Sequence, residues 1–197
     1  MSANLYIDTK GLSSIRVDLQ SISKQIPGAT TSAINRTIDF TNTKTVKEVT
    51  KEYTVKNKTV KGTLKKVRAR GNSLYAYISS TGPTISLGNF QHTPRNYSKK
   101  PKAVNVRIKK AEGYKVIKTN PKAFVQKIYG SESDIYMRKG SKRFPVIKLR
   151  SLSVPQMIAN EKILNNIQEA AQKKLQERIN HEIEWRLNKA ASKKGGK

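Results

Sequence analysis

The spacing of apolar residues changes twice along the chain, and no other feature constrains the fold as strongly. Apolar residues recur every three or four positions from residue 12 to 53, alternate between 54 and 153, and return to the longer spacing from 154 to 187. The first spacing is that of a helix and the second that of a strand. The sequence therefore predicts an α+β fold: N-terminal helices, a central, mostly antiparallel β-sheet, and a long C-terminal amphipathic helix.

The N-terminal segment, residues 1–53, contains two predicted helices. A single apolar stripe runs over residues 12–26 and predicts the first of them. Pro27-Gly28 is expected to break the chain, and the second helix is predicted from Thr31 to Glu52. Its many threonines have low helix propensity, so this helix needs tertiary packing to form.

The central segment, residues 54–153, is predicted to be the sheet. Residues 66–70 and 74–78 alternate around Gly71-Asn72, which predicts a hairpin. Further strands are predicted over 104–108, 114–117, 123–129, 135–137 and 146–149. Residues 88–102 show no periodicity and contain two prolines, so an extended arm is expected near them.

The C-terminal segment, residues 154–197, is predicted to be one helix from Val154 to Leu187, with Ser153 as its cap and Pro155 in its first turn. At about 1.5 Å per residue such a helix is longer than a small sheet can cover. Part of its stripe is therefore expected at a subunit interface, and the candidates are Leu175, Ile179, Ile183 and Leu187. The three segments are expected to form one structural domain.

Positive charge is concentrated in the middle of the chain. The protein has 40 Lys and Arg against 13 Asp and Glu, a net charge of +27, and residues 54–150 carry +21 of it. Such a segment favours nonspecific phosphate contact, although a solvated face that only aids solubility is the alternative. The candidate DNA-proximal residues are Lys65, Lys66, Arg68, Arg70, Arg95, Lys99, Lys100, Lys102, Lys109 and Lys110.

Residue types that commonly take part in catalysis are scarce in this chain. There is no cysteine, and His92 and His181 are interpreted as surface or ordinary hydrogen-bonding residues. Glu132 and Asp134 flank Ser133 in an expected hairpin turn. We therefore expect no enzyme, with no catalytic, cofactor-binding or metal-binding residues, no cofactor and no small-molecule substrate. No apolar stretch reaches the length of a membrane span, so no membrane partner is expected.

Five short motifs occur in an order that resembles the minor tail protein Z family of tailed phages. The resemblance covers roughly residues 30–170. The motifs are Ala33-Ile34-Asn35-Arg36, Ala123-Phe124-Val125, Ile135-Tyr136-Met137-Arg138, Phe144-Pro145-Val146-Ile147-Lys148-Leu149 and Ser153-Val154-Pro155-Gln156-Met157. The chain departs from the family pattern at residues 150–153, where it has Arg-Ser-Leu-Ser in place of a Gly-Pro-Ser type of turn.

The resemblance implies a structural virion protein that completes the tail at its head-proximal end. It also implies a homo-oligomeric ring with the symmetry of the tail, with a hexamer favoured, and partners among tail terminator, tail tube or connector proteins. Nonspecific contact with phage DNA would follow, with the host cytoplasm as the place of assembly. The charge alone supports a different class, a free nonspecific nucleic-acid-binding protein of nucleoid or ribosomal type. A nuclease is a third reading, but clustered carboxylates are missing.

Overall fold

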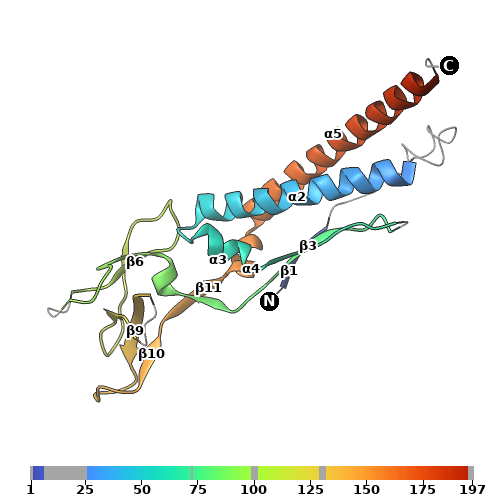
Figure 1. The fold of residues 1–197 in the computed structure, drawn as a ribbon. Coiled ribbons are helices and arrows are strands. Elements are labelled where there is room, and N and C mark those ends of the chain that lie inside the picture. Colours follow the sequence, from blue (N-terminus) through green and yellow to red (C-terminus); the bar gives the residue numbers. More distant parts are fainter. Residues whose placement is uncertain (1, 7–25, 72, 99–101, 129–131, 195–197) are drawn as a thin grey trace. The chain divides into compact units, whose positions relative to one another are not determined.

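The chain is divided by its internal contacts into two compact units. The computed structural model describes residues 2–6, 26–71, 73–98, 102–128 and 132–194 (Figure 1). Unit 1 contains Val46–Thr63 and Thr81–Ala159, and unit 2 contains Ser2–Thr45, Leu64–Ser80 and Asn160–Lys197. Both units combine helices with antiparallel strand pairs, so the predicted α+β class is confirmed.

Unit 2 combines two helices with a three-stranded sheet. Its helices are the N-terminal part of α2 (Ile26–Glu52) and α5 (Glu161–Lys194). The sheet has the order β1-β3-β2, from β1 (Ser2–Tyr6), β3 (Tyr77–Thr81) and β2 (Leu64–Val67). The most deeply buried apolar side chains are Ala33, Ile34, Ile38 and Ile167.

The predicted helix from Thr31 to Glu52 is confirmed as α2, although α2 begins earlier, at Ile26. The expected break at Pro27-Gly28 is wrong, because a proline in the first helical turn lacks only an N–H that has no partner within the helix. The helix predicted over 12–26 lies outside the described residues, apart from Ile26.

Three threonines of α2 are buried, so the helix has the tertiary packing that its low propensity requires. Thr37, Thr41 and Thr45 are buried, and each hydroxyl donates to the carbonyl oxygen four residues earlier at 2.8 Å. A hydroxyl that bonds within its own helix can be buried without an unsatisfied donor. This polar stripe therefore packs inside the protein together with the isoleucines.

The predicted hairpin is also confirmed. Strand β2 pairs with β3 in antiparallel register, with Val67 opposite Tyr77, and a further bridge joins Arg70 to Ser73. Gly71, next to the turn, has φ of +54°, a conformation that glycine adopts without steric cost.

Unit 1 contains three small sheets and two short helices, α3 (Asn57–Lys61) and α4 (Val154–Ile158). The sheet orders are β11-β4, β5-β6-β7 and β10-β9-β8. The strands are β4 (Thr84–Ser86), β5 (Gln91–Thr93), β6 (Asn105–Arg107), β7 (Lys115–Val116), β8 (Phe124–Gln126), β9 (Asp134–Arg138), β10 (Val146–Lys148) and β11 (Arg150–Ser153). A short 3-10 helix, η2 (Leu87–Asn89), follows β4. All five strands predicted between residues 104 and 149 are present as β6 to β10.

Two expectations are wrong, one for the central segment and one for the C-terminal segment. The arm near 88–102 contains β5, which pairs with β6, because the backbone of this aperiodic segment forms hydrogen bonds with the next strand along the chain. The single predicted C-terminal helix is two helices, since α4 ends at Ile158 and α5 starts at Glu161. Asn160 stands in the position before α5, where asparagine is a favoured cap, and its carbonyl accepts from the Leu164 N–H. The predicted Ser153 cap and the Pro155 position are confirmed, with a complete capping box to Gln156.

Candidate nucleic-acid interface

The predicted DNA-proximal residues belong to both units. Lys65, Lys66, Arg68 and Arg70 lie on the β2–β3 hairpin of unit 2. Arg95, Lys102, Lys109 and Lys110 belong to unit 1, whereas Lys99 and Lys100 lie outside the described residues. The structure therefore divides the predicted set into a hairpin group and a unit 1 group.

The hairpin group is partly neutralised by a carboxylate of α2. Lys66 Nζ lies 2.6 Å from Asp39 Oδ1, and Arg68 Nη2 lies 2.8 Å from Asp39 Oδ2. The hydrogen bond from Lys66, with help from Arg68, lowers the pKa of Asp39 against the effect of burial. Asp39 therefore leaves the hairpin group less positive than the sequence suggests.

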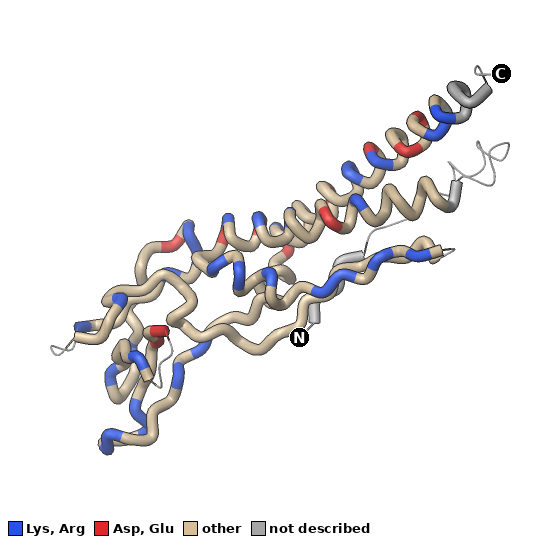
Figure 2. The backbone as a smooth tube through the Cα atoms, viewed as in Figure 1, with Lys and Arg blue, Asp and Glu red and all other residues tan. Residues whose placement is uncertain are grey.

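The unit 1 group stands in a strongly basic environment. Unit 1 holds 22 Lys and Arg against five Asp and Glu, a net charge of +17. The three carboxylates of residues 81–159 each have a lysine partner: Lys56 with Glu132, Lys148 with Asp134, and both Lys109 and Lys115 with Glu112. Figure 2 shows Lys and Arg spread over the strands and loops of this unit, with few acidic residues among them. Cations therefore greatly exceed the carboxylates that could neutralise them.

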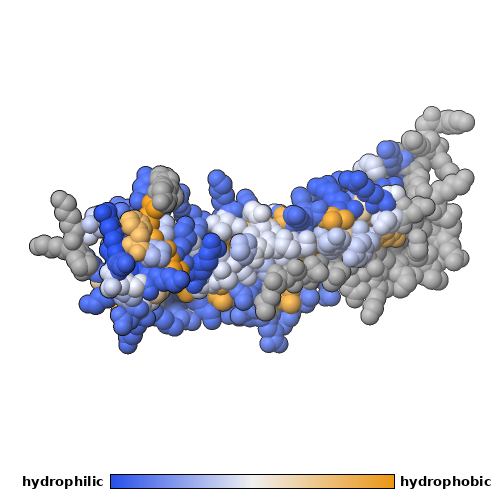
Figure 3. All heavy atoms as spheres, turned by 90° about the horizontal axis from the view of Figure 1, so that it is seen from below, coloured by the Kyte–Doolittle hydropathy of each residue, from blue (hydrophilic) through white to orange (hydrophobic). Residues whose placement is uncertain are grey.

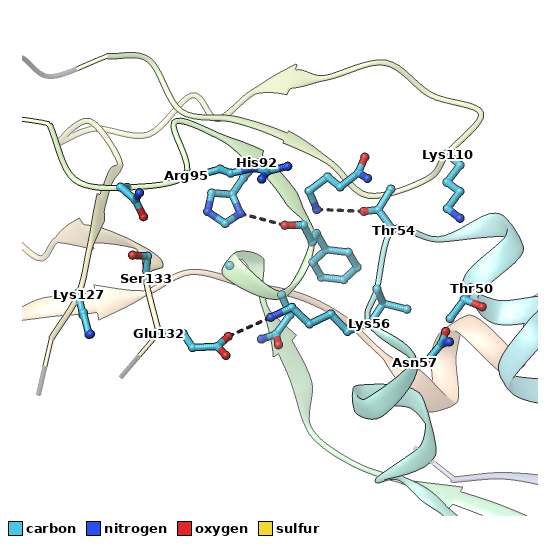
Figure 4. Close-up of a pocket in the computed structure, with 16 residues that line it drawn as sticks. Thr50, Thr54, Lys56, Asn57, His92, Arg95, Lys110, Lys127, Glu132 and Ser133 are labelled. Atoms are coloured by element: carbon cyan, nitrogen blue, oxygen red, sulfur yellow. Dashed lines mark hydrogen bonds and ion pairs between the residues drawn. The ribbon is translucent and has the colours of Figure 1, made fainter. Parts of the chain in front are cut away.

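Four Lys and Arg residues of unit 1 line one open hollow of about 830 Å³, here called the basic hollow (Figure 4). They are Lys56, Arg95, Lys110 and Lys127. Among the described residues that line it, Glu132 alone carries a carboxylate, and it lies 3.0 Å from Lys56 Nζ. The arrangement attracts anions and offers phosphate groups several donors at once.

Separate elements position the cations of the basic hollow. Lys110 follows β6, and its backbone N–H donates to the Glu52 carbonyl at the end of α2 at 2.7 Å. Arg95 follows β5, Lys127 follows β8, and Lys56 precedes α3. The sequence predicted Arg95 and Lys110 because they belong to clusters, and it missed Lys56 and Lys127 because only the tertiary structure brings these two isolated lysines to the hollow.

The two histidines belong to different units. His92 lines the basic hollow, and its Nδ1 lies 2.9 Å from the Phe90 carbonyl oxygen (Figure 4). His181 is exposed on α5. Within the described ranges, no group of three or more His, Asp or Glu side chains is placed to hold a metal ion. None of the described helices is long and apolar enough to cross a membrane.

A buried carboxylate holds β9 to η2 and β10, and sequence reasoning placed it in a turn. Asp134 is the first residue of β9 and is only 7% exposed. Its Oδ1 accepts hydrogen bonds from the Ser86 hydroxyl and from the N–H groups of Gly88 at 2.9 Å and Ile135 at 2.8 Å. Its Oδ2 lies 3.0 Å from Lys148 Nζ. Glu132 and Ser133 do lie between the antiparallel strands β8 and β9, but Asp134 is a strand residue whose carboxylate is buried by donors more than 40 residues away in sequence.

These donors determine the charge state of Asp134. Burial alone would raise the pKa of its carboxyl, but the hydrogen bonds from Ser86, Ile135, Lys148 and Gly88 together lower the pKa below its ordinary value. The contact also requires glycine at position 88, since a Cβ there would lie 2.5 Å from Asp134 Oδ1 and 2.9 Å from its Cα. Asp134 is thus a buried structural anion.

The predicted interface residues lie on α5. Leu175 and Ile179 are each 5% exposed, so they pack within a single chain, and Ile183 is half-buried. The Leu187 side chain is outside the described set. Contact of this stripe with a second copy stays a prediction.

Comparison with known proteins gives one match. A family model described as prophage minor tail protein Z (GPZ) matches residues 9–193 of the 197-residue chain. Neither the curated proteins nor the solved structures include a match.

Proposed function

Because the chain belongs to the prophage minor tail protein Z family, we propose that this phage minor tail protein acts at the head-proximal end of the tail and takes part in head–tail joining. Its role is structural and involves no catalysis. It assembles in the host cytoplasm as a ring with the symmetry of the tail, for which a hexamer is favoured, against tail terminator, tail tube or connector proteins.

The basic hollow is the observation that supports this position most directly. The end of a tail that receives the DNA end needs cations that contact phosphate groups without recognising the base sequence. Unit 1 supplies such cations, with a net charge of +17 and few carboxylates. Repetition of the hollow around a ring would multiply weak contacts into strong retention. Lys66 and Arg68 of the hairpin contribute less, because Asp39 pairs with both.

Electron microscopy of lysates from a phage lacking this gene tests the position. We expect filled heads and complete-length tails that stay separate, or particles that join and do not retain or deliver DNA. Supplying the gene in trans should restore joined, infectious particles. A lysate without tails, or with tails of abnormal length, would instead assign the protein to tail initiation or length control.

The contact with DNA is tested by removing two charges from the basic hollow. Arg95→Gln with Lys127→Gln should make the negative slope of log Kobs for duplex DNA against log salt concentration shallower by about 2, since each lost phosphate contact removes about 0.9 from its magnitude. Lys162→Gln with Lys173→Gln, two exposed positions on α5, removes the same charge and should leave the slope unchanged. Fluorescence anisotropy at several salt concentrations measures both. An equal change in the two variants would mean that total charge, and not the hollow, binds DNA.

A further inference from the structure

A second hollow of unit 1 combines cations with aromatic rings. It measures about 630 Å³ and is here called the aromatic groove. Five of its lining residues are cations: Lys102, Lys122, Lys127, Arg138 and Arg143. Three are aromatic: Tyr97, Phe124 and Phe144. Among the described residues that line it there is no carboxylate. Lys127 and Asn96 also line the basic hollow, so the two sites are neighbours on one unit.

Two of the three rings are largely exposed. The Tyr97 and Phe144 residues are each 60% exposed. On the face of unit 1 seen in Figure 3, hydrophobic residues are exposed and surrounded by hydrophilic ones. Exposed aromatic side chains with cations around them are typical of surfaces that bind a partner.

The cations lie against the faces of the rings. The guanidinium carbon of Arg143 is 5.7 Å from the centre of the Phe144 ring, and that of Arg138 is 5.5 Å from the centre of the Phe124 ring. Arg138 Nη1 also donates to the Arg143 carbonyl oxygen at 2.7 Å, which ties the loop after β9 to the strand. The loop that carries Phe144 is thus held beside the groove.

We propose that the aromatic groove binds unpaired nucleotides of a DNA strand, with bases stacked on Tyr97 and Phe144 and phosphates held by the surrounding Lys and Arg. Any base can stack on an exposed ring, and the cations beside the ring can contact the phosphates of the DNA backbone. In a duplex the base faces are already stacked on one another, so the rings gain a partner only where a strand is unpaired. The inference rests on the proposed function, in which unit 1 meets DNA.

The test compares single-stranded and duplex DNA of the same sequence on the full chain. An unlabelled dT oligonucleotide of about 15 residues supplies the unpaired strand, and competition in fluorescence anisotropy gives both affinities. Phe144→Ala and Tyr97→Ala should each weaken single-strand binding by about 10-fold, as loss of one stacking platform does, and leave duplex affinity unchanged. Phe144→Trp should retain wild-type affinity for the single strand.

Tyr114 supplies the matched control. It is 52% exposed in unit 1 and does not line the groove, so Tyr114→Ala should leave both affinities unchanged. Circular dichroism confirms that each variant is folded, and because both groove rings are exposed, their loss removes little packing.

Two results would overturn the inference, and they differ from failure of the proposed function. If wild-type protein binds duplex DNA but Phe144→Ala and Tyr97→Ala leave single-strand affinity unchanged, the groove is not a stacking site while the DNA contact stands. If a poly-glutamate peptide competes as well as the oligonucleotide and loses the same 10-fold on Phe144→Ala, the groove takes acidic chains in general. Failure of the proposed function would appear separately, as joined and infectious particles in the phage that lacks the gene.

Discussion

Replacing Asp134 by alanine is expected to lower the free energy of unfolding by about 3 kcal/mol or more, the scale seen when a buried group with several partners is removed. The variant would leave the Ser86 hydroxyl and the N–H groups of Gly88 and Ile135 without their acceptor in a buried site, and Lys148 without its counter-ion. Urea denaturation followed by circular dichroism measures the change.

Glu132→Ala is the control for this variant. Glu132 also pairs with a lysine, Lys56, but its side chain is 86% exposed, and exposed ion pairs contribute little because water screens them. The unfolding midpoint should stay close to that of the wild type. Equal destabilisation by the two substitutions would mean that net charge, and not the buried network, accounts for the effect.

The same carboxylate makes stability depend on pH in a defined direction. The pKa of Asp134 is lower in the folded protein than the ordinary value of 3.8, so its stabilising contribution is complete above that value and is lost as pH falls through the folded pKa. Asp134→Asn removes a titrating group, and its unfolding free energy should therefore decline less than that of the wild type between pH 5 and pH 2. A parallel decline in both proteins would show that other carboxylates dominate acid unfolding.

Placing a charge on the buried face of α5 is the second substitution for which we expect a large effect. Ile179→Asp puts a carboxylate where the side chain is 5% exposed, and burial of an unpaired charge is expected to cost about 4 kcal/mol or more. Whole proteins are stable by about 5–15 kcal/mol. Most molecules of this variant should therefore show no cooperative unfolding transition. Thermal unfolding by circular dichroism, together with solubility, measures the result.

Gln172→Asp introduces the same charge on an exposed position of α5 and should fold normally. The comparison also tests the interface predicted from the sequence. If Ile179→Asp is as stable as the wild type and fails only to assemble into an oligomer, the stripe serves a subunit contact rather than the packing of unit 2. Ile183, which is half-buried, is the better position for an assembly variant, because its change to aspartate disturbs less of the core.

Local spacing was sufficient to predict the two long helices, α2 and α5, and seven of the described strands. The spacing of apolar residues by about 3.6 positions in a helix and by 2 in a strand depends only on residues a few positions apart. The apolar face that results is buried in any fold that forms a core. For this reason α2, the β2–β3 hairpin and the strands β6 to β10 were predictable, as was the Ser153 cap, which bonds three residues ahead. The signal for the break between α4 and α5 was also local, in Asn160, but the continuous apolar stripe concealed it.

Contacts between distant parts of the chain decided the rest. Asp134 is a buried anion only because Ser86 and Gly88, 48 and 46 residues away, donate to it. The sequence showed an excess of cations in residues 54–150, and this excess is the basis for proposing phosphate as the ligand. Strand pairing decided which of those cations lie together. Lys127 after β8 and Arg95 after β5 line one hollow. In the hairpin group, by contrast, Asp39 of α2 neutralises part of the charge. The physical reason is that net charge adds up along the chain without regard to position, while a site requires charges within a few ångströms of one another, and that depends on tertiary structure.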